Sequence, residues 1–392
     1  MTGLLVSLLA AAFVVGSPLP AWHEGCLDIH AINSGRGECT FFILPDGTTL
    51  LVDAGESFRT PSGKYTAVAP RPNADVRAYE VYVEYIRHFM PRRSRGALDY
   101  ALITHYHSDH FGTEAEWSAP DSVRSYALTG ISALQAELPI RKLIDRSYPE
   151  YDSVWLPSSS KCTFYQDFVR YATAHDGMKA ERFRVGESKQ FKLLHRPCRY
   201  RNFGIFNYAA GGIVWDGEKS VNVYEDGDMK ENGASCCFLL SYGDFDYYTG
   251  GDAGGNGRVA LPVARAIGRK IEAMKADHHF SYHCMKDETM GIYQPRVVVT
   301  QVFTDREIQP DYTVVDRLLS DAVYPGPKYY YFTNLGENQL RLHGDVYERA
   351  AGIGGHVVIR VMPGGHEYYV LVLDDTDFEY RVKSIDGPFK CE

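Results

Sequence analysis

The sequence predicts an α/β (α+β) fold, and three observations lead to this prediction. Short apolar runs rich in β-branched and aromatic residues alternate with segments in which apolar residues recur at helical spacing. Several of the strand-like runs end in a turn that contains glycine, aspartate or histidine. The chain has 392 residues and is 45% apolar, so it can bury one large core together with an elaboration.

The first half is expected to contain a strand, a hairpin, a helix and a further strand. The predicted strands lie near residues 27–32, 39–44, 49–53 and 98–104. The second and third flank Pro45-Asp46-Gly47, which is typical of a hairpin turn. The helix is expected near 77–90, where apolar residues form one stripe: Tyr79, Tyr82, Val83, Ile86 and Met90.

The second half repeats this organisation after a long middle region. The middle, about 113–231, is expected to form an inserted cap, with a helix from Thr163 to His175. Further strands are expected at 235–240, at 245–249, before His278 and at 296–300, with a helix within about 257–270. Tyr329 to Phe332 is expected to be a strand packed on both faces rather than a sugar-stacking platform. A hairpin of 355–362 and 367–373 would make a small C-terminal β appendage at about 350–392, with His366 exposed in its turn.

Four potential metal ligands fall within six residues after the strand at 98–104: His105, His107, Asp109 and His110. On a helix the first two would point about 200° apart, but in a tight turn after a strand all four can converge. Imidazole and carboxylate ligands suit zinc, manganese or iron, and this set is larger than one tetrahedral ion needs. We therefore expect two adjacent divalent ions, with Zn²⁺ favoured and Mn²⁺ or iron as alternatives.

This His-x-His-x-Asp-His spacing resembles the signature of the metallo-β-lactamase superfamily. The resemblance implies a four-layer αββα sandwich in which Asp53 supports the metal loop and Asp252 bridges the ions. In the pair His278-His279, the second residue best matches the last ligand of the superfamily. The first is then a neighbour that contacts substrate or backbone, although which of the two binds metal stays open.

Three stretches resemble the ComEC-type branch more narrowly: 27–47, 232–252 and the His278-His279 pair. His107 is present here although many members of that branch lack it, and Asn232 stands where other branches have a histidine. The resemblance implies a first ion held by His105, His107 and Asp252, completed by water or Asn232. The implied second ion has the ligands Asp109, His110, Asp252 and His279. His175 and His195 are alternative sources of the missing ligand, and Asn232 and Ser235 are expected to contact the ligands.

The expected chemistry follows from the ions. Zinc lowers the pKa of bound water to about 7, so a metal-bound hydroxide is available as the nucleophile at neutral pH. Asp109 is both a ligand and the group best placed to orient that hydroxide and return a proton. Tyr106, Tyr282 and His283 flank the metal loops and are further candidates for donating a proton to the leaving group.

Charge and targeting signals bear on partners and location. The net charge of −9 argues against passive wrapping of nucleic acid, but leaves small-molecule or phosphodiester substrates open. The apolar run Leu4 to Gly16 and the small residues 17–21 predict a secretory signal peptide over 1–21 and an extracellular protein, soluble after removal of the signal. The eight cysteines fit that compartment, and some disulfides are expected, although Cys236 and Cys237 suit a core strand better.

The sequence thus predicts a secreted, dinuclear metal-dependent hydrolase over residues 22–392. Phosphodiester or nucleic-acid-derived substrates are favoured because of the ComEC-type resemblance. Hydrolysis of an ester, lactone or β-lactam is the alternative within the same fold. A binding protein that holds a single structural metal and an iron-dependent oxidoreductase are hypotheses of other classes. No sequence feature assigns an oligomeric state.

Overall fold

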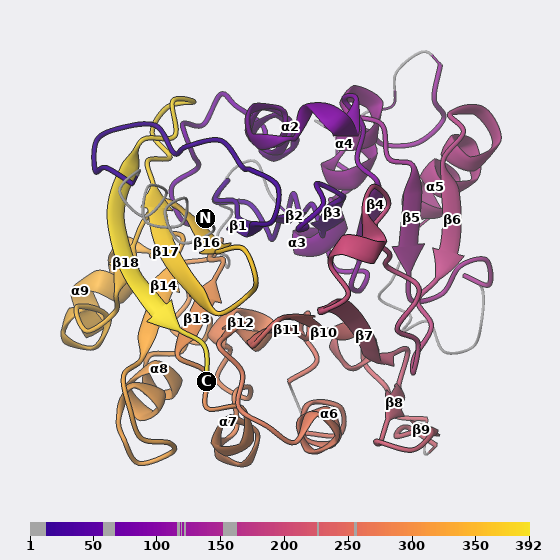
Figure 1. Cartoon of the computed structure of the whole chain (residues 1–392). Helices are drawn as coiled ribbons and strands as arrows, with labels where there is room; N and C mark the ends of the chain where they lie inside the picture. The colour runs from indigo at the N-terminus through magenta and orange to yellow at the C-terminus, as the bar shows by residue number, and fades with distance from the viewer. Residues whose placement is uncertain are drawn as a thin grey trace.

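Two nine-stranded mixed sheets form the centre of the molecule, with helices on their outer sides (Figure 1). The computed structural model describes residues 13–392 except 58–66, 116, 117, 119, 121, 122, 152–162, 226, 255 and 256. The first sheet has the order β18 (Val382–Lys390), β17 (Glu367–Leu373), β16 (His356–Val361), β1 (Leu27–Ala31), β2 (Thr40–Ile43), β3 (Thr49–Val52), β4 (Tyr100–Ile103), β5 (Lys142–Asp145) and β6 (Lys179–Arg182). The second has the order β15 (Gly352–Ile353), β14 (Tyr329–Phe332), β13 (Val297–Thr300), β12 (Ala273–Lys275), β11 (Phe245–Thr249), β10 (Cys237–Tyr242), β7 (Phe203–Ala210), β8 (Ile213–Trp215) and β9 (Ser220–Asn222).

Each sheet has its own group of helices. The first sheet is accompanied by α2 (Ala78–Phe89), α3 (Ser108–Phe111), α4 (Gly130–Glu137) and α5 (Thr163–His175). The second is accompanied by α6 (Ala260–Ile267), α7 (Asp287–Tyr293), α8 (Tyr312–Leu319) and α9 (Glu337–Tyr347). The short 3₁₀ turns are η1 (Arg92–Ser94), η3 (Pro197–Arg199), η4 (Glu231–Ala234) and η5 (Asp277–Phe280).

Three apolar cores lie between these layers. One joins the first sheet to its helices and includes Phe41 and Tyr82. The middle core lies between the two sheets, where the rings of Phe42 and Phe238 are 6.2 Å apart. The third joins the second sheet to α6 to α9. Three cores separate four layers, so the predicted αββα sandwich is confirmed.

Alternation along the strands explains why both sheets are covered on both faces. In β2, Phe41 and Ile43 enter the core under the helices, while Phe42 enters the core between the sheets. The predicted strand at Tyr329 to Phe332 behaves in the same way, since Tyr331 faces the other sheet and Tyr330 faces the helices. A strand that is apolar on both faces fits only an inner layer of such a sandwich.

The expected C-terminal appendage is instead part of the first sheet. The predicted hairpin is present as β16 and β17, but β16 also pairs with β1, with Asp28 opposite Arg360. The two side chains form a buried ion pair at 2.6 Å. Burial alone would raise the pKa of Asp28, but Arg360 outweighs it and lowers that pKa to about 2. No local pattern encodes this pairing, because it joins segments more than 300 residues apart.

The middle region does not form a separate cap either. Its strands β5 and β6 continue the first sheet in parallel, and β7, β8 and β9 continue the second sheet. The expected helix is present as α5 with the predicted bounds. Four of these strands, β5, β6, β8 and β9, have only three or four residues, and β6 has no buried residue to give an apolar pattern. The eight-residue β7 is the exception.

The expectation of disulfides is wrong for the seven cysteines that the structure describes, all of which are free thiols. Cys236 packs between the sheets and Cys237 under the helices, on opposite faces of the chain entering β10, as expected of core residues. Cys162 lies outside the described residues.

Part of the predicted signal region is described and contacts the first sheet. The backbone N–H of Gly16 donates to the carbonyl of Val382 at 2.8 Å, and Leu19 is buried. Residues 1–12 lie outside the described residues, so the signal peptide stays a prediction. Within the described ranges, no helix combines the length and apolar character that crossing a bilayer requires.

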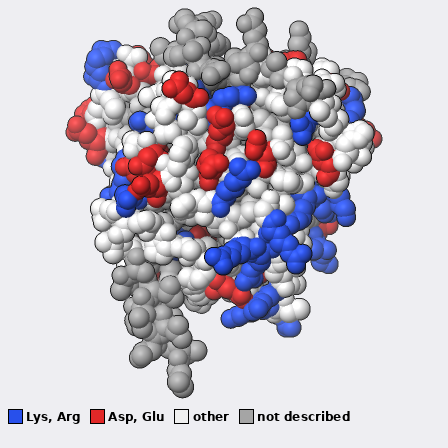
Figure 2. Space-filling model, turned by 90° about the horizontal axis from the view of Figure 1, so that it is seen from above, with Lys and Arg blue, Asp and Glu red and all other residues white. Residues whose placement is uncertain are grey.

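The charges are unevenly spread over the surface. On the face in Figure 2, Lys and Arg gather most densely towards the lower right, while Asp and Glu are scattered over the upper part. The net charge of −9 therefore does not describe every part of the surface.

Candidate metal centre

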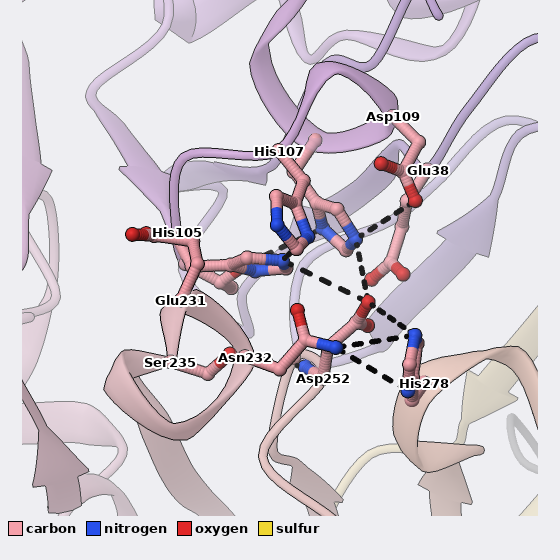
Figure 3. A network of polar contacts seen from close by, with 12 residues as sticks. Glu38, His105, His107, Asp109, Glu231, Asn232, Ser235, Asp252 and His278 are labelled. Carbon is pink, nitrogen blue, oxygen red and sulfur yellow. Dashed lines mark hydrogen bonds and ion pairs between the residues drawn. The ribbon is translucent and has the colours of Figure 1, made fainter. Parts of the chain in front are cut away.

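Donor side chains from three loops meet where strands of both sheets end (Figure 3). The metal loop, residues His105 to His110, follows β4 and includes the start of α3. Asp252 follows β11, and His279 lies in η5, directly after β12. Because β4 is parallel to β3 and β11 is parallel to β12, their carboxyl ends carry loops to a common side.

Four of these residues have the spacing of a tetrahedral metal site. Asp109 Oδ2 lies 3.4 Å from His110 Nε2 and 3.3 Å from His279 Nε2. His110 Nε2 lies 3.4 Å from His279 Nε2 and 3.4 Å from Asp252 Oδ2. Atoms bound about 2.0–2.1 Å from zinc at the corners of a tetrahedron lie about 3.4 Å apart. The expected ligands of the second ion therefore already have the separations that one zinc ion requires.

The expected first ion has a looser set of donors. His105 Nε2 lies 3.2 Å from His107 Nδ1 and 3.7 Å from Asp252 Oδ2. Two buried acceptors of this set, Asp252 Oδ2 and Asn232 Oδ1, receive no hydrogen bond from any described residue. Buried acceptors without donors are costly unless a cation satisfies them. These residues thus fit a metal ion.

Hydrogen bonds behind the ligands fix which ring nitrogen faces the centre. His110 Nδ1 lies 2.7 Å from Asp53 Oδ2, and Asp53 also accepts hydrogen bonds from the N–H and hydroxyl of Thr104 at 2.8 and 2.7 Å. His279 Nδ1 lies 2.8 Å from the carbonyl oxygen of Gln301. With Nδ1 donating in both rings, Nε2 is left to bind metal. Asp53 thus has the supporting position that the resemblance implies.

Two glycines let the metal loop lie directly on the neighbouring backbone. A Cβ added to Gly55 would lie 1.8 Å from the carbonyl oxygen of Asp109, and one added to Gly37 would lie 2.7 Å from it. That carbonyl accepts a hydrogen bond from the N–H of Glu38 at 2.7 Å, and the carbonyl of His110 accepts one from Ala54 at 2.8 Å. Gly55, two residues after Asp53, is therefore needed for close approach of the metal loop.

Asp252 is held by two further contacts, one of them predicted and one not. The hydroxyl of Ser235 accepts a hydrogen bond from the N–H of Asp252 at 3.1 Å, as expected for a residue that contacts a ligand. Lys275 was not anticipated: its Nζ lies 3.3 Å from Asp252 Oδ1 and 2.9 Å from Glu38 Oε2. Burial alone would lower the pKa of Lys275, but the two carboxylates outweigh it and raise that pKa. In the sequence, the only sign of this contact is that Lys275 lies within the apolar run before His278.

Glu38 is a second residue that the sequence analysis did not place in the site. Its carboxylate belongs to a fully buried group of possible ligands with His110, Asp252 and His279. Because Glu38 is also paired with Lys275, we interpret it as the counter-ion of that lysine. With Asp53, Asp109 and Asp252 it brings four carboxylates to the centre, against one lysine.

The titration of the ligands reflects both their burial and this excess of negative charge. Burial, reinforced by His110, lowers the pKa of His105 well below its usual range, which keeps the ring neutral and able to bind metal. Burial would do the same to His110, but Asp252, Asp53 and Asp109 outweigh it and raise the pKa of His110 well above its usual range. Metal binding must displace the proton from His110, so metal affinity should rise with pH as that proton is lost.

Both members of the histidine pair lie at the centre. Besides His279, His278 places its Nε2 atom 3.6 Å from Asp252 Oδ2, and its ring contacts the side-chain nitrogen of Asn232 at 3.2 Å (Figure 3). Burial lowers the pKa of His278 to about 4, so its ring is neutral at physiological pH.

Some predicted residues are not brought to the centre. The ring of Tyr106 is buried against Phe111, Tyr151 and Tyr165, so it does not face the metal ligands. This burial removes the basis for a proton-donor role. His175 lies at the end of α5 against Tyr171, and the other alternative ligand His195, like the turn residue His366, is exposed. By contrast, His283 and the 57% exposed Tyr282 line a pocket of about 490 Å³ that reaches Asn232.

Comparisons with known proteins give only remote likenesses. No family model and no curated protein matches this chain. CmlA, a diiron β-hydroxylase from Streptomyces venezuelae, is 12% identical over 88% of this chain and 55% of its own, with a TM-score of 0.40. Zn²⁺-bound PqqB from Methylobacterium extorquens is 12% identical over 85% of this chain and 99% of its own, with a TM-score of 0.37. The short form of human tRNase Z is 10% identical over 69% of this chain and 91% of its own, with a TM-score of 0.33.

Likenesses at this level assign no chemistry to the chain, so its function has to be argued from its own side chains. Those side chains and the layers around them define an αββα sandwich with a candidate dinuclear metal centre.

Proposed function

We propose that this protein is a secreted metal-dependent hydrolase with two divalent ions, acting on phosphodiester or nucleic-acid-derived substrates. The observation that carries the proposal is the spacing of the donors: Asp109 Oδ2 and the Nε2 atoms of His110 and His279 lie 3.3 to 3.4 Å apart. A carboxylate oxygen and two imidazole nitrogens at these distances match the corners of a tetrahedron around one zinc ion.

Two groups of residues would hold the ions. His105, His107 and Asp252, with Asn232, would bind the first, and Asp109, His110, Asp252 and His279 would bind the second. When bound, two such cations lower the pKa of a water molecule and offset the charge that develops on the substrate in the transition state. Imidazole and carboxylate donors suit Zn²⁺, and Mn²⁺ or iron use the same ligand types.

Asp109 is the residue that can move a proton. Its side chain is 13% exposed, while that of Asp252 is 1% exposed. Asp109 can therefore orient an attacking water molecule through a carboxylate oxygen and later return the proton to the leaving group. Asp252 is fixed by Ser235 and Lys275, so its role is to hold the two metal positions together.

The adjoining pocket offers a cation to an anionic substrate. Besides Tyr282 and His283, it is lined by Lys230, by Asp228 and by Asn232, the residue beside the first metal position. The exposed ammonium group of Lys230 and the tyrosine hydroxyl can contact phosphate oxygens while the reacting group lies at the metals. The preference for phosphodiesters rests on this lining and on the ComEC-type motif, and export rests on the apolar run from Leu4 to Gly16.

The test compares hydrolysis of bis-p-nitrophenyl phosphate, single-stranded DNA and a chromogenic lactam by zinc-loaded and manganese-loaded protein. We expect phosphodiester hydrolysis that falls about a hundredfold or more in Asp109→Asn, because the group that handles the proton is lost. The matched control is Asp345→Asn, which removes an exposed carboxylate on α9 and should leave activity unchanged.

Metal analysis gives the second part of the test. The double variant His105→Ala, His279→Ala should hold two fewer ions per chain than the wild type. Lactam turnover without phosphodiester turnover would overturn the substrate class. An unchanged metal content in the double variant, or turnover that survives in Asp109→Asn, would overturn the proposed centre. An iron absorption spectrum with no hydrolysis would favour an oxidoreductase.

A further inference from the structure

The chain turns sharply at the end of β12 and separates two adjacent histidine rings. His278, His279 and Phe280 have φ angles of 47°, 51° and 60°, three consecutive left-handed residues that are not glycine. Side chains other than glycine adopt this conformation only at an energetic cost. Strain of this kind is kept where the surrounding structure and the site require it. Its effect here is that His279 faces the dinuclear centre while His278 lies between Asp252 and the turn at 281–286.

That turn brings a second set of metal-binding side chains to His278. His278 Nδ1 lies 3.2 Å from His283 Nε2 and 3.7 Å from Cys284 Sγ. All three donor atoms lie within 4.8 Å of one another. In a tetrahedral zinc site, two nitrogens are about 3.4 Å apart, and a nitrogen and a sulfur are about 3.6 Å apart. The two separations from His278 Nδ1 are close to these values.

Hydrogen bonding within the protein accounts for only part of this cluster. A single nitrogen, His278 Nδ1, is the hydrogen-bonding partner of both the His283 ring and the Cys284 thiol, which is fully buried and in no disulfide. Asp277 lies beside that thiol, since a Cβ added to Gly254 would be 3.1 Å from atoms of both. Both carboxylate oxygens of Asp277 are buried and receive no hydrogen bond from the described residues. A buried carboxylate without a hydrogen bond, next to a buried thiol and two imidazole rings, is an environment that a cation would satisfy.

We propose that His278, His283 and Cys284 bind a third metal ion of the zinc class, separate from the dinuclear centre. Two imidazoles and a thiolate select zinc and related transition metals over magnesium or calcium. Three protein donors leave a fourth position for water or substrate, and the partly exposed His283 places this position at the pocket. His283 is then a metal ligand rather than the proton donor that the sequence suggested.

The third site also contacts the dinuclear centre. Because His278 uses Nδ1 towards His283 and Cys284, its Nε2 atom remains directed at Asp252 Oδ2, 3.6 Å away. One ring thus links the two sites. A substrate in the pocket would meet the third ion on one side and the first metal position on the other.

Cobalt substitution tests the proposal in the full-length protein, because cobalt bound by a thiolate has a strong near-ultraviolet charge-transfer band. We expect about three ions per chain in the wild type and this band in its cobalt form. Cys284→Ser should lose one ion and the whole band. Cys391→Ser, which removes another free thiol far along the chain, should keep both.

The double variant His105→Ala, His279→Ala separates this proposal from the proposed function. It should lose two ions and keep the thiolate band. A wild type without the band, or a band that persists in Cys284→Ser with native circular dichroism, would overturn the third site and leave the dinuclear proposal intact. If Cys284→Ser fails to fold, His283→Gln gives the same readout from a partly exposed position.

Discussion

At the scale of single residues, the buried lysine is the least expected part of the centre. Lys275 is 2% exposed and its partner Glu38 is 1% exposed, so neither charge is screened by water. Removing one member of such a pair leaves an uncompensated charge in a low-dielectric environment, whereas removing both does not.

We therefore expect Lys275→Met to lower the free energy of unfolding of the metal-loaded protein by about 3–5 kcal/mol. Adding Glu38→Gln should recover part of this loss, because Asp252 still lacks its contact with Lys275, and urea denaturation of both single variants and the double variant can measure it. Lys390→Met, which breaks an exposed pair with Glu367, is the control and should change stability far less. Strict additivity of the two buried substitutions would contradict the pairing.

At the scale of elements, the contact between the loop after β3 and the loop after β4 sets the position of the ligands. Gly55 lies directly against the carbonyl of Asp109, so any larger residue must push the metal loop away. Ligand distances matter to a few tenths of an ångström, so this movement disturbs the second metal position more than it disturbs the fold.

Gly55→Ala should thus weaken metal binding by at least about tenfold, in line with other changes just outside a metal's ligands. Competition with a chromogenic chelator measures this change. Gly344→Ala in α9 is the matched control, since a Cβ there meets no atom within 4 Å and alanine favours a helix. Equal metal affinity in the two variants would show that the close approach at Gly55 has no bearing on the ions.

At the scale of the whole molecule, the ions would join the two sheets. His105 to His110 belong to the first sheet's loops, while Asp252 and His279 belong to the second. An ion bound only by the folded protein, at a free concentration of 100 times its Kd, adds about 2.7 kcal/mol to stability.

Chelation should accordingly lower the melting temperature of the wild type by several degrees. In the double variant His105→Ala, His279→Ala the same chelator should have a clearly smaller effect, because the ions that join the sheets are already absent. Differential scanning calorimetry measures both shifts. A chelator effect of the same size in both proteins would mean that the stabilising ions bind elsewhere.

The parts of the molecule that could be predicted from the sequence are those with a local pattern. The strand at 245–249, the helix from Thr163 to His175 and the strand at 367–373 agree with β11, α5 and β17 to the residue. The metal loop could also be recognised, because its histidines and aspartate are close in sequence and follow a strand.

The rest depends on contacts between distant segments, which a single sequence does not display. The pairing of Asp28 with Arg360 and of Glu38 with Lys275 joins ordinary charged residues far apart in the chain. In the sequence, Cys284 is one of several scattered cysteines. In the structure, the left-handed turn at His278 places its thiol beside two rings. Tyr106, by contrast, lies next to a ligand in sequence but packs into the core, because alternate residues leaving a strand face opposite sides.

The pairing of β1 with β16 has a consequence for how the protein is made. During synthesis β1 keeps one edge unpaired until residues 356–361 have been made, so this part of the first sheet stays incomplete while the more than 300 residues between the two strands are translated. For a protein that we propose is exported, this delay favours a chain that can still be threaded through a narrow translocation channel. It also means that a prematurely terminated chain exposes an unpaired strand edge and is readily recognised by quality control.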